Sequence, residues 1–183
     1  MPHSINPETT HFRGYLPHIE GANFQMITFR LADSLPQNYF IKIKNETKNK
    51  AKQRQRIEDA MDRGYGRCWL AEPEIATLVA NAFKKFHQDR YNLIAFTVMP
   101  NHVHVLIEVF EGETLYKIVH SWKSYTAHAI SRYAKSRSET LTFPIWQREY
   151  WDRHIRDQRH YEAAIRYIED NPVKAGLVVK AED

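Results

Sequence analysis

The sequence predicts an α+β fold in which a four-stranded antiparallel sheet carries helices on one face and an extra helix follows at the C-terminal end. Apolar residues switch between a two-residue and a 3.6-residue period along the chain, which separates strands from helices. The resulting order is strand, helix, strand, strand, helix, strand, helix. Its first six elements match the β-α-β-β-α-β order of ferredoxin-like folds. Such folds host many functions, so the chemistry has to be argued from individual residues.

Composition predicts the first strand, and the spacing of apolar residues predicts the first helix. Residues 24 to 31 (FQMITFRL) are rich in Ile, Thr and Phe, which favour strands. Residues 72 to 90 predict a helix, because apolar side chains recur there at three- and four-residue steps. The buried stripe of this helix would consist of Ile75, Leu78, Val79, Ala82 and Phe86.

A hairpin and a second helix form the middle of the predicted order. The apolar runs at residues 92 to 99 and 103 to 109 are joined through Pro100-Asn101, which predicts a tight β-hairpin. Residues 115 to 134 again show helical spacing. The core face of this second helix would consist of Leu115, Ile118, Val119, Trp122 and Ala129.

The C-terminal part predicts a short strand at residues 149 to 155 and then a third helix. Asp157 can cap that helix, because its side chain can accept hydrogen bonds from the first free N–H groups. Pro172 disfavours helical geometry at Asn171, so we expect the helix to end there.

Two segments lie outside this order. Residues 1 to 21 are interrupted by Pro and Gly, so we expect an irregular arm. Residues 36 to about 66 are expected to form a basic helical insertion that Gly64 and Gly66 bring to an end. Between Lys42 and Arg56, seven basic residues stand against one acid, Glu46, which suits either a solvated helix face or a phosphate-contacting surface. These basic residues are Lys42, Lys44, Lys48, Lys50, Lys52, Arg54 and Arg56.

Composition and charge narrow the class of partner. The chain has 183 residues, a net charge of +4 and a pI near 9.1, which favours nucleic acid over a membrane surface. No apolar run approaches the roughly 20 residues that span a bilayer. The first 21 residues lack the apolar core of a secretory signal. The one cysteine, Cys68, fits a reducing cytoplasm and is expected to be an unreactive thiol.

The most informative segment is MPNHVHVLI, in which His102 and His104 flank Val103. Side chains alternate along a strand, so both imidazoles point to one face while the valines point into the packed layer. Two imidazoles on a rigid edge are a common way to hold a catalytic divalent metal. The short pattern also suits two histidines on a polar sheet face that have no metal.

A second candidate group lies far downstream, in AIRYIEDNPVKAGLV. Tyr167 and Asn171 are four residues apart and therefore lie on one helix face. A phenol has a pKa near 10, and a nearby cation would favour its nucleophilic phenolate form. The amide oxygen of Asn171 could bind the same cation. The same spacing also suits a packing tyrosine followed by an ordinary helix terminator.

The combination of these segments resembles a known family. The chain is similar to the REP-associated tyrosine transposases, relatives of the single-tyrosine insertion-sequence transposases within the HUH nuclease superfamily. The similarity runs from about Gly14 to Val179. It is carried by GYLPHIE, TFRLADSLP, MPNHVHVLI, HSWKSYTAHAISR, WQREYWDRHIRD and YIEDNPVKAGLV.

The resemblance implies one transposase-like catalytic domain over residues 1 to 183, which cleaves and rejoins single-stranded DNA beside short palindromic hairpins. His102 and His104 would bind Mg²⁺ or Mn²⁺, and Asn171 would take the third-ligand position, where related enzymes commonly have glutamine. Tyr167 would be the nucleophile and form a 5′-phosphotyrosine with a free 3′-hydroxyl. The partner would be single-stranded or hairpin DNA, bound by a monomer or a homodimer.

Tyr125 and Tyr150 compete with Tyr167 as nucleophiles, because each lies in a segment that resembles the family. Tyr167 is preferred, since only Tyr167 has an amide one turn away. Aromatic and basic side chains in these segments suit base stacking and phosphate contacts. The predicted DNA-binding residues are Lys123, Arg148, Tyr150, Trp151, Arg153 and Arg156.

Three questions stay open at the level of sequence. Paired imidazoles alone also suit zinc, nickel or copper, and a zinc hydrolase would take its carboxylate from Glu108, far along the strand from His104. A domesticated DNA-binding module that no longer cuts DNA is the other alternative. The sequence also leaves open whether a DNA-contacting tail follows Asp183, where relatives often continue.

Overall fold

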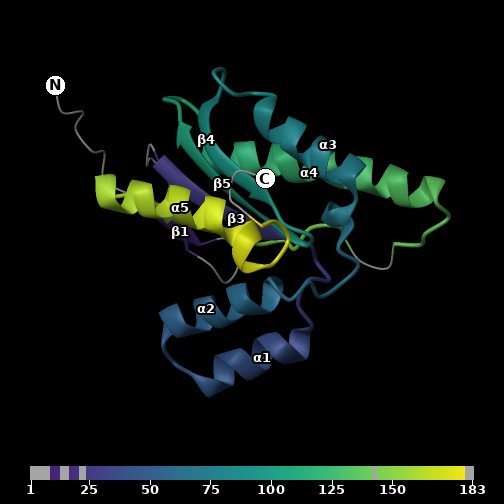
Figure 1. Ribbon diagram of the computed structural model, residues 1–183. Helices are drawn as coiled ribbons and strands as arrows, with labels where there is room; N and C mark the ends of the chain where they lie inside the picture. The colour runs from purple at the N-terminus through teal and green to yellow at the C-terminus, as the bar shows by residue number, and fades with distance from the viewer. Residues whose placement is uncertain (1–8, 13–16, 21–23, 142–143, 180–183) are drawn as a thin grey trace.

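The central element of the computed structural model, which describes residues 9–12, 17–20, 24–141 and 144–179, is a four-stranded antiparallel sheet (Figure 1). Its strand order is β4-β5-β3-β6. This order places the first and third strands of the β-α-β-β-α-β core side by side in the middle, which confirms the predicted fold class. The strands are β3 (Phe24–Arg30), β4 (Tyr91–Val98), β5 (His102–Val109) and β6 (Trp151–His154).

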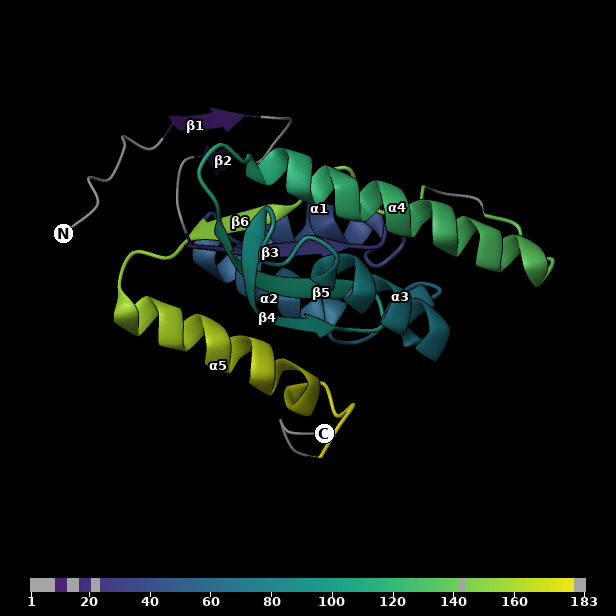
Figure 2. The same cartoon turned by 90° about the horizontal axis from the view of Figure 1, so that it is seen from above.

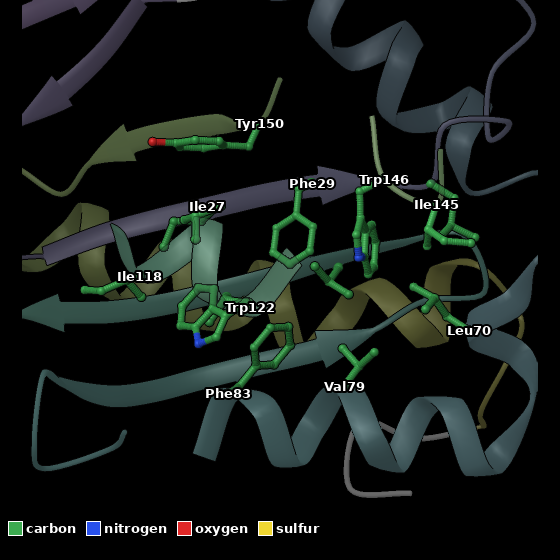
Figure 3. Close-up of a cluster of buried hydrophobic side chains, with 14 of the residues drawn as sticks. Ile27, Phe29, Leu70, Val79, Phe83, Ile118, Trp122, Ile145, Trp146 and Tyr150 are labelled. Carbon is green, nitrogen blue, oxygen red and sulfur yellow. The ribbon is translucent and has the colours of Figure 1, made fainter. Parts of the chain in front are cut away.

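One face of the sheet packs on α3 (Pro73–Lys84) and α4 (Leu115–Ser136), and the main hydrophobic core lies between them (Figure 3). Every residue of the core face predicted for α4 is buried. The helix predicted to reach residue 90 ends at Lys84, because a tight turn with Gln88 at φ 68° leads directly into β4.

The other face of the sheet packs on α5 (Gln158–Lys174), and Figure 2 shows α4 and α5 on opposite sides of the sheet. Asp157 caps α5 as predicted, with its side chain accepting from the His160 N–H. The expected end at Asn171 is wrong, because α5 continues through Pro172. A proline in the last turn forfeits only one N–H, and the helix ends just before Gly176, which has φ +69°.

The basic insertion forms two antiparallel helices below the sheet in Figure 1. They are α1 (Gln37–Glu46) and α2 (Lys50–Met61), and Asn49 caps α2 by accepting from the N–H groups of Ala51 and Lys52. A separate small core holds the pair together. Its buried members are Leu35, Ile43, Ile57, Ala60 and Met61, and Trp151 packs against them. A short 3-10 turn, η1 (Trp69–Ala71), leads on to α3.

The sequence predicted an irregular arm, but part of the arm is regular. The strand β1 (Thr9–Phe12) pairs there with β2 (Pro17–Glu20). Pro17 is tolerated there because it is the first residue of an edge strand. The predicted breaks at Pro2, Pro7, Gly14 and Gly21 lie outside the described residues. Within the described ranges, no helix is both long and apolar enough to cross a bilayer.

Candidate active site

The hairpin of β4 and β5 holds both candidate histidines on the α5 side of the sheet. His102 and His104 are buried, with 1% and 0% of their surfaces exposed. The alternating residues Val103 and Val105 point the other way, into the main core. This alternation confirms the predicted orientation of the two imidazoles.

The two imidazoles face each other through their Nε2 atoms, which lie 3.1 Å apart. Each Nδ1 has a different neighbour: Asn101 Oδ1 lies 2.8 Å from Nδ1 of His102, and Thr28 Oγ1 lies 2.7 Å from Nδ1 of His104. Burial lowers the pKa of His104 to about 3. Burial, followed by the electrostatic effects of the neighbouring His104 and Arg30, lowers the pKa of His102 well below its usual value. Both rings are therefore neutral at pH 7.

Tyr167 of α5 lies directly against this pair. Its ring packs edge-on against His104, with ring centroids 5.1 Å apart. Its hydroxyl is hydrogen-bonded to the Glu58 carboxylate and to the Asn171 side chain. Burial, followed by the negative charges of Glu58 and Asp62, raises the pKa of Tyr167. The phenol is thus held in its protonated form by the protein alone.

Asn171 lies one turn beyond Tyr167 and is 3% exposed. A hydrogen bond with Asn171 lowers the pKa of Tyr167, and the amide N–H is its donor because Oδ1 of Asn171 has no hydrogen-bond partner. The other atom of the amide, Oδ1, is buried and accepts no hydrogen bond from the described residues. An unpaired buried oxygen is costly, so this atom is suited to a positively charged or donating ligand.

Two acidic residues at this site were not predicted from the sequence. Asp62, just after α2, has its Oδ1 3.6 Å from Nε2 of His102, and that oxygen is also buried without a hydrogen-bond partner. Burial, and then the charge of Asp59, raise the pKa of Asp62 to about 6. Glu58 lies one turn earlier in α2. Their segment is basic overall, and no local pattern connects it to a site on the sheet.

The donor set fits a hard divalent cation. Metal–ligand bonds of about 2.1 Å at right angles place neighbouring donor atoms about 3 Å apart, which matches the 3.1 Å between the two Nε2 atoms. Oxygen donors of the kind that Mg²⁺ and Mn²⁺ prefer are present in Asn171 and Asp62. No three His, Cys, Asp or Glu side chains in the described ranges form a ready-made metal site. The amide, or an added ligand, would therefore have to complete the coordination.

The predicted DNA-binding residues fall into two groups. Lys123, Arg148 and Tyr150 line a cavity of about 270 Å³ beside α4. The Lys123 ammonium donates to the carbonyl oxygens of Gln147 and Arg148, 2.7 and 2.8 Å away. Tyr150 is only 8% exposed and belongs to the main core (Figure 3), which leaves little of its ring free for a base.

The second group lies around β6. Arg153 and Arg156 are exposed, and Arg153 is close enough to Glu58 to lower the pKa of that carboxyl, which burial raises overall. Trp151 packs against the small core of the insertion. Of the three candidate nucleophiles, Tyr167 is the one in contact with a histidine of the pair. Tyr125 is exposed on α4, which packs on the opposite face of the sheet.

Comparisons with known proteins agree with this architecture. A solved REP-associated tyrosine transposase, bound to a REP hairpin, superposes with a TM-score of 0.58 at 22% identity, over 96% of this chain and 79% of that one. At this identity the match establishes a shared fold.

Curated relatives match the chain over part of its length. The REP-associated tyrosine transposase of Escherichia coli is 29% identical over 110 residues, which are 58% of this chain and 59% of the relative. A Haemophilus influenzae protein, provisionally given the same name, is 29% identical over 98 residues, or 51% and 56%. The chain thus spans a little over half the length of these relatives. The model of the family described as "Transposase IS200 like" matches residues 67–171, more than half of the chain. The chain is therefore a member of the IS200-like transposase family.

Proposed function

We propose that this chain is a metal-dependent endonuclease that cleaves and rejoins single-stranded DNA at short palindromic hairpins, with Tyr167 as nucleophile. The observation that carries the proposal is the edge-on contact between Tyr167 and His104, whose Nε2 faces that of His102. A hydroxyl nucleophile thus lies beside two neutral imidazoles, although the sequence separates them widely. Both groups belong to one chain, so their meeting requires no partner subunit.

In the proposed step, the Tyr167 oxygen bonds to phosphorus while the bond from phosphorus to the 3′-oxygen breaks. The phenol proton ends on the 3′-oxygen, so the products are a 5′-phosphotyrosine and a free 3′-hydroxyl. His102, His104 and Asn171 would hold Mg²⁺ or Mn²⁺, which would polarise the phosphodiester and favour the phenolate when bound. Glu58 accepts the hydrogen bond of the Tyr167 hydroxyl and so orients the nucleophile. The phosphotyrosine conserves the bond energy that rejoining needs.

Net charge and the solved neighbour support the choice of substrate class. The solved neighbour is bound to a REP hairpin, and this chain carries a net charge of +4, with exposed Arg153 close to Glu58 and exposed Arg156 just after β6. Positive charge supports phosphate contacts without specifying sequence. We therefore propose hairpin-bearing single-stranded DNA as the partner.

The test uses labelled single-stranded hairpin DNA with Mn²⁺ or with EDTA, followed by a denaturing gel. We expect a covalent protein–DNA adduct with Mn²⁺ that is lost in EDTA and in Tyr167→Phe. DNA that is retarded on a native gel but never cut would overturn the proposal in favour of a domesticated binding module.

A zinc hydrolase is less well supported. Glu108 shares a strand face with His104 but lies four residues further on, about 14 Å away at the rise of an extended strand. That separation is too large for ligands of one ion. Asp62 is the nearer carboxylate, so Zn²⁺-dependent hydrolysis of small esters in the absence of DNA would favour this alternative.

A further inference from the structure

Asn101, in the turn between β4 and β5, is fully buried and bonded on both sides of its amide. Its Nδ2 donates to two main-chain carbonyl oxygens, that of Met61 at 3.1 Å and that of Tyr65 at 3.0 Å. Its Oδ1 lies 2.8 Å from Nδ1 of His102. Carbonyl oxygens can only accept, so these two bonds fix which end of the amide carries the N–H groups.

The fixed amide determines the state of the neighbouring imidazole. Asn101 presents an acceptor to His102, so Nδ1 of His102 must be the donor. Burial disfavours a charged ring, and a neutral imidazole that carries its proton on Nδ1 has its lone pair on Nε2. That Nε2 is the atom that lies 3.1 Å from Nε2 of His104.

We propose that Asn101 is a positioning residue that locks His102 in the Nδ1–H form and thereby prepares its Nε2 to bind the divalent cation. The inference rests on the proposed function for the identity of the ligand. It goes further in tying the metal site to the end of α2, because Met61 and Tyr65 hold the amide in place. Without this bond, the proton would be free to occupy Nε2, and a cation would have to displace it.

A second asparagine of the same hairpin, Asn92, serves as a comparison. Asn92 lies on β4, in the same hairpin, and its side chain accepts a hydrogen bond from Gln88. Its register partner is Glu108, at the opposite end of β5 from His102. Asn92→Ala therefore removes an amide from the hairpin without affecting the imidazole pair.

The first measurement reads the tautomer in the unaltered protein. Long-range ¹H–¹⁵N spectra of the metal-free protein with ¹⁵N-labelled histidine report which ring nitrogen carries the proton. We expect the Nδ1–H pattern for His102 at pH 7.5, with the resonance assigned through its loss in His102→Gln. An Nε2–H pattern would overturn the inference, whatever the protein does to DNA.

The second measurement is Mn²⁺ affinity by titration calorimetry. Loss of partners that orient a metal ligand typically weakens binding 10- to 100-fold. We expect Asn101→Ala to lose the pure Nδ1–H pattern and to bind Mn²⁺ about tenfold more weakly, while Asn92→Ala changes neither. An Asn101→Ala protein that keeps both properties would refute the role. If the unaltered protein binds no Mn²⁺ at all, the proposed function fails, and the result for the tautomer still stands by itself.

Discussion

The Asp62 carboxylate approaches His102 to 3.6 Å, and its buried Oδ1 accepts no hydrogen bond from the described residues. Burial raises the pKa of Asp62 from 3.8 to about 6. The stability associated with the neutral carboxyl is thus present below pH 3.8 and lost as pH rises through about 6. At pH 7.5 the metal-free protein holds a buried carboxylate at a cost.

Asp62→Asn should therefore stabilise the metal-free protein at pH 7.5 by about 1 to 3 kcal/mol, measured by urea unfolding in EDTA. With Mn²⁺ we expect Asp62→Asn to be less stable than the unaltered protein. The variant lacks a negative neighbour for the cation, so it gains less stability from binding the cation. Glu111→Gln, an exposed change in the turn after β5, is the control and should stay within about 0.5 kcal/mol in both conditions. A variant that is destabilised in EDTA and unchanged in its response to Mn²⁺ would contradict this account.

Glu58→Gln should slow formation of the protein–DNA adduct by about 10- to 100-fold, measured as initial rates on hairpin DNA with Mn²⁺. The Tyr167 hydroxyl would lose its carboxylate acceptor and with it a defined orientation. Glu162→Gln changes an exposed carboxylate of α5, the same helix as Tyr167, and should cut at the normal rate. Equal rates for the two variants would exclude a role for Glu58.

Lys123 should make folding stability rise at alkaline pH. Burial lowers the pKa of its ammonium from 10.5 to about 8, so the folded protein releases this proton earlier than the unfolded chain. Its contribution to stability is present above pH 10.5 and lost as pH falls through about 8. Between these values the unfolding free energy of the wild type should gain about 1 to 2 kcal/mol relative to Lys123→Met. Lys135→Met, an exposed change near the end of α4, should follow the wild type.

Arg153→Ala should weaken binding of single-stranded DNA and reduce its dependence on salt. Arg153 is exposed on β6 and close to Glu58, so it is placed to contact a phosphate near Tyr167. One lost phosphate contact lowers the slope of log K against log salt by about 0.7 on a single strand. Fluorescence anisotropy over a salt series measures both effects. Lys135→Ala, on α4, is the control, and an equal change in both variants would mean that Arg153 contributes only general charge.

Local sequence patterns predicted the sheet and its histidine pair well. The alternation along β5 fixed the direction of His102 and His104, and helical spacing fixed the buried face of α4. These features depend on near neighbours in the chain. The end of α5 was misjudged because a proline near a helix end loses one hydrogen bond without stopping the helix.

The rest of the site depends on contacts between distant segments. Asp62 and Glu58 belong to a basic insertion whose composition suggests a solvated face, and only the packing of α2 against the sheet brings them to His102 and Tyr167. The same holds for the Asn101 amide, which is held by carbonyl oxygens of Met61 and Tyr65. Tyr150 was expected to stack on bases and instead lies in the core, because an aromatic residue next to basic ones has the same local pattern in either setting.

The central claim is that Tyr167 becomes covalently joined to DNA, and peptide mapping of the adduct tests it most directly. After cleavage with Mn²⁺, nuclease trimming and trypsin, mass spectrometry should find the nucleotide on the peptide of residues 167 to 174, whose one tyrosine is Tyr167. A nucleotide on the peptide of residues 124 to 132, which holds Tyr125, or of residues 149 to 153, which holds Tyr150, would contradict the account.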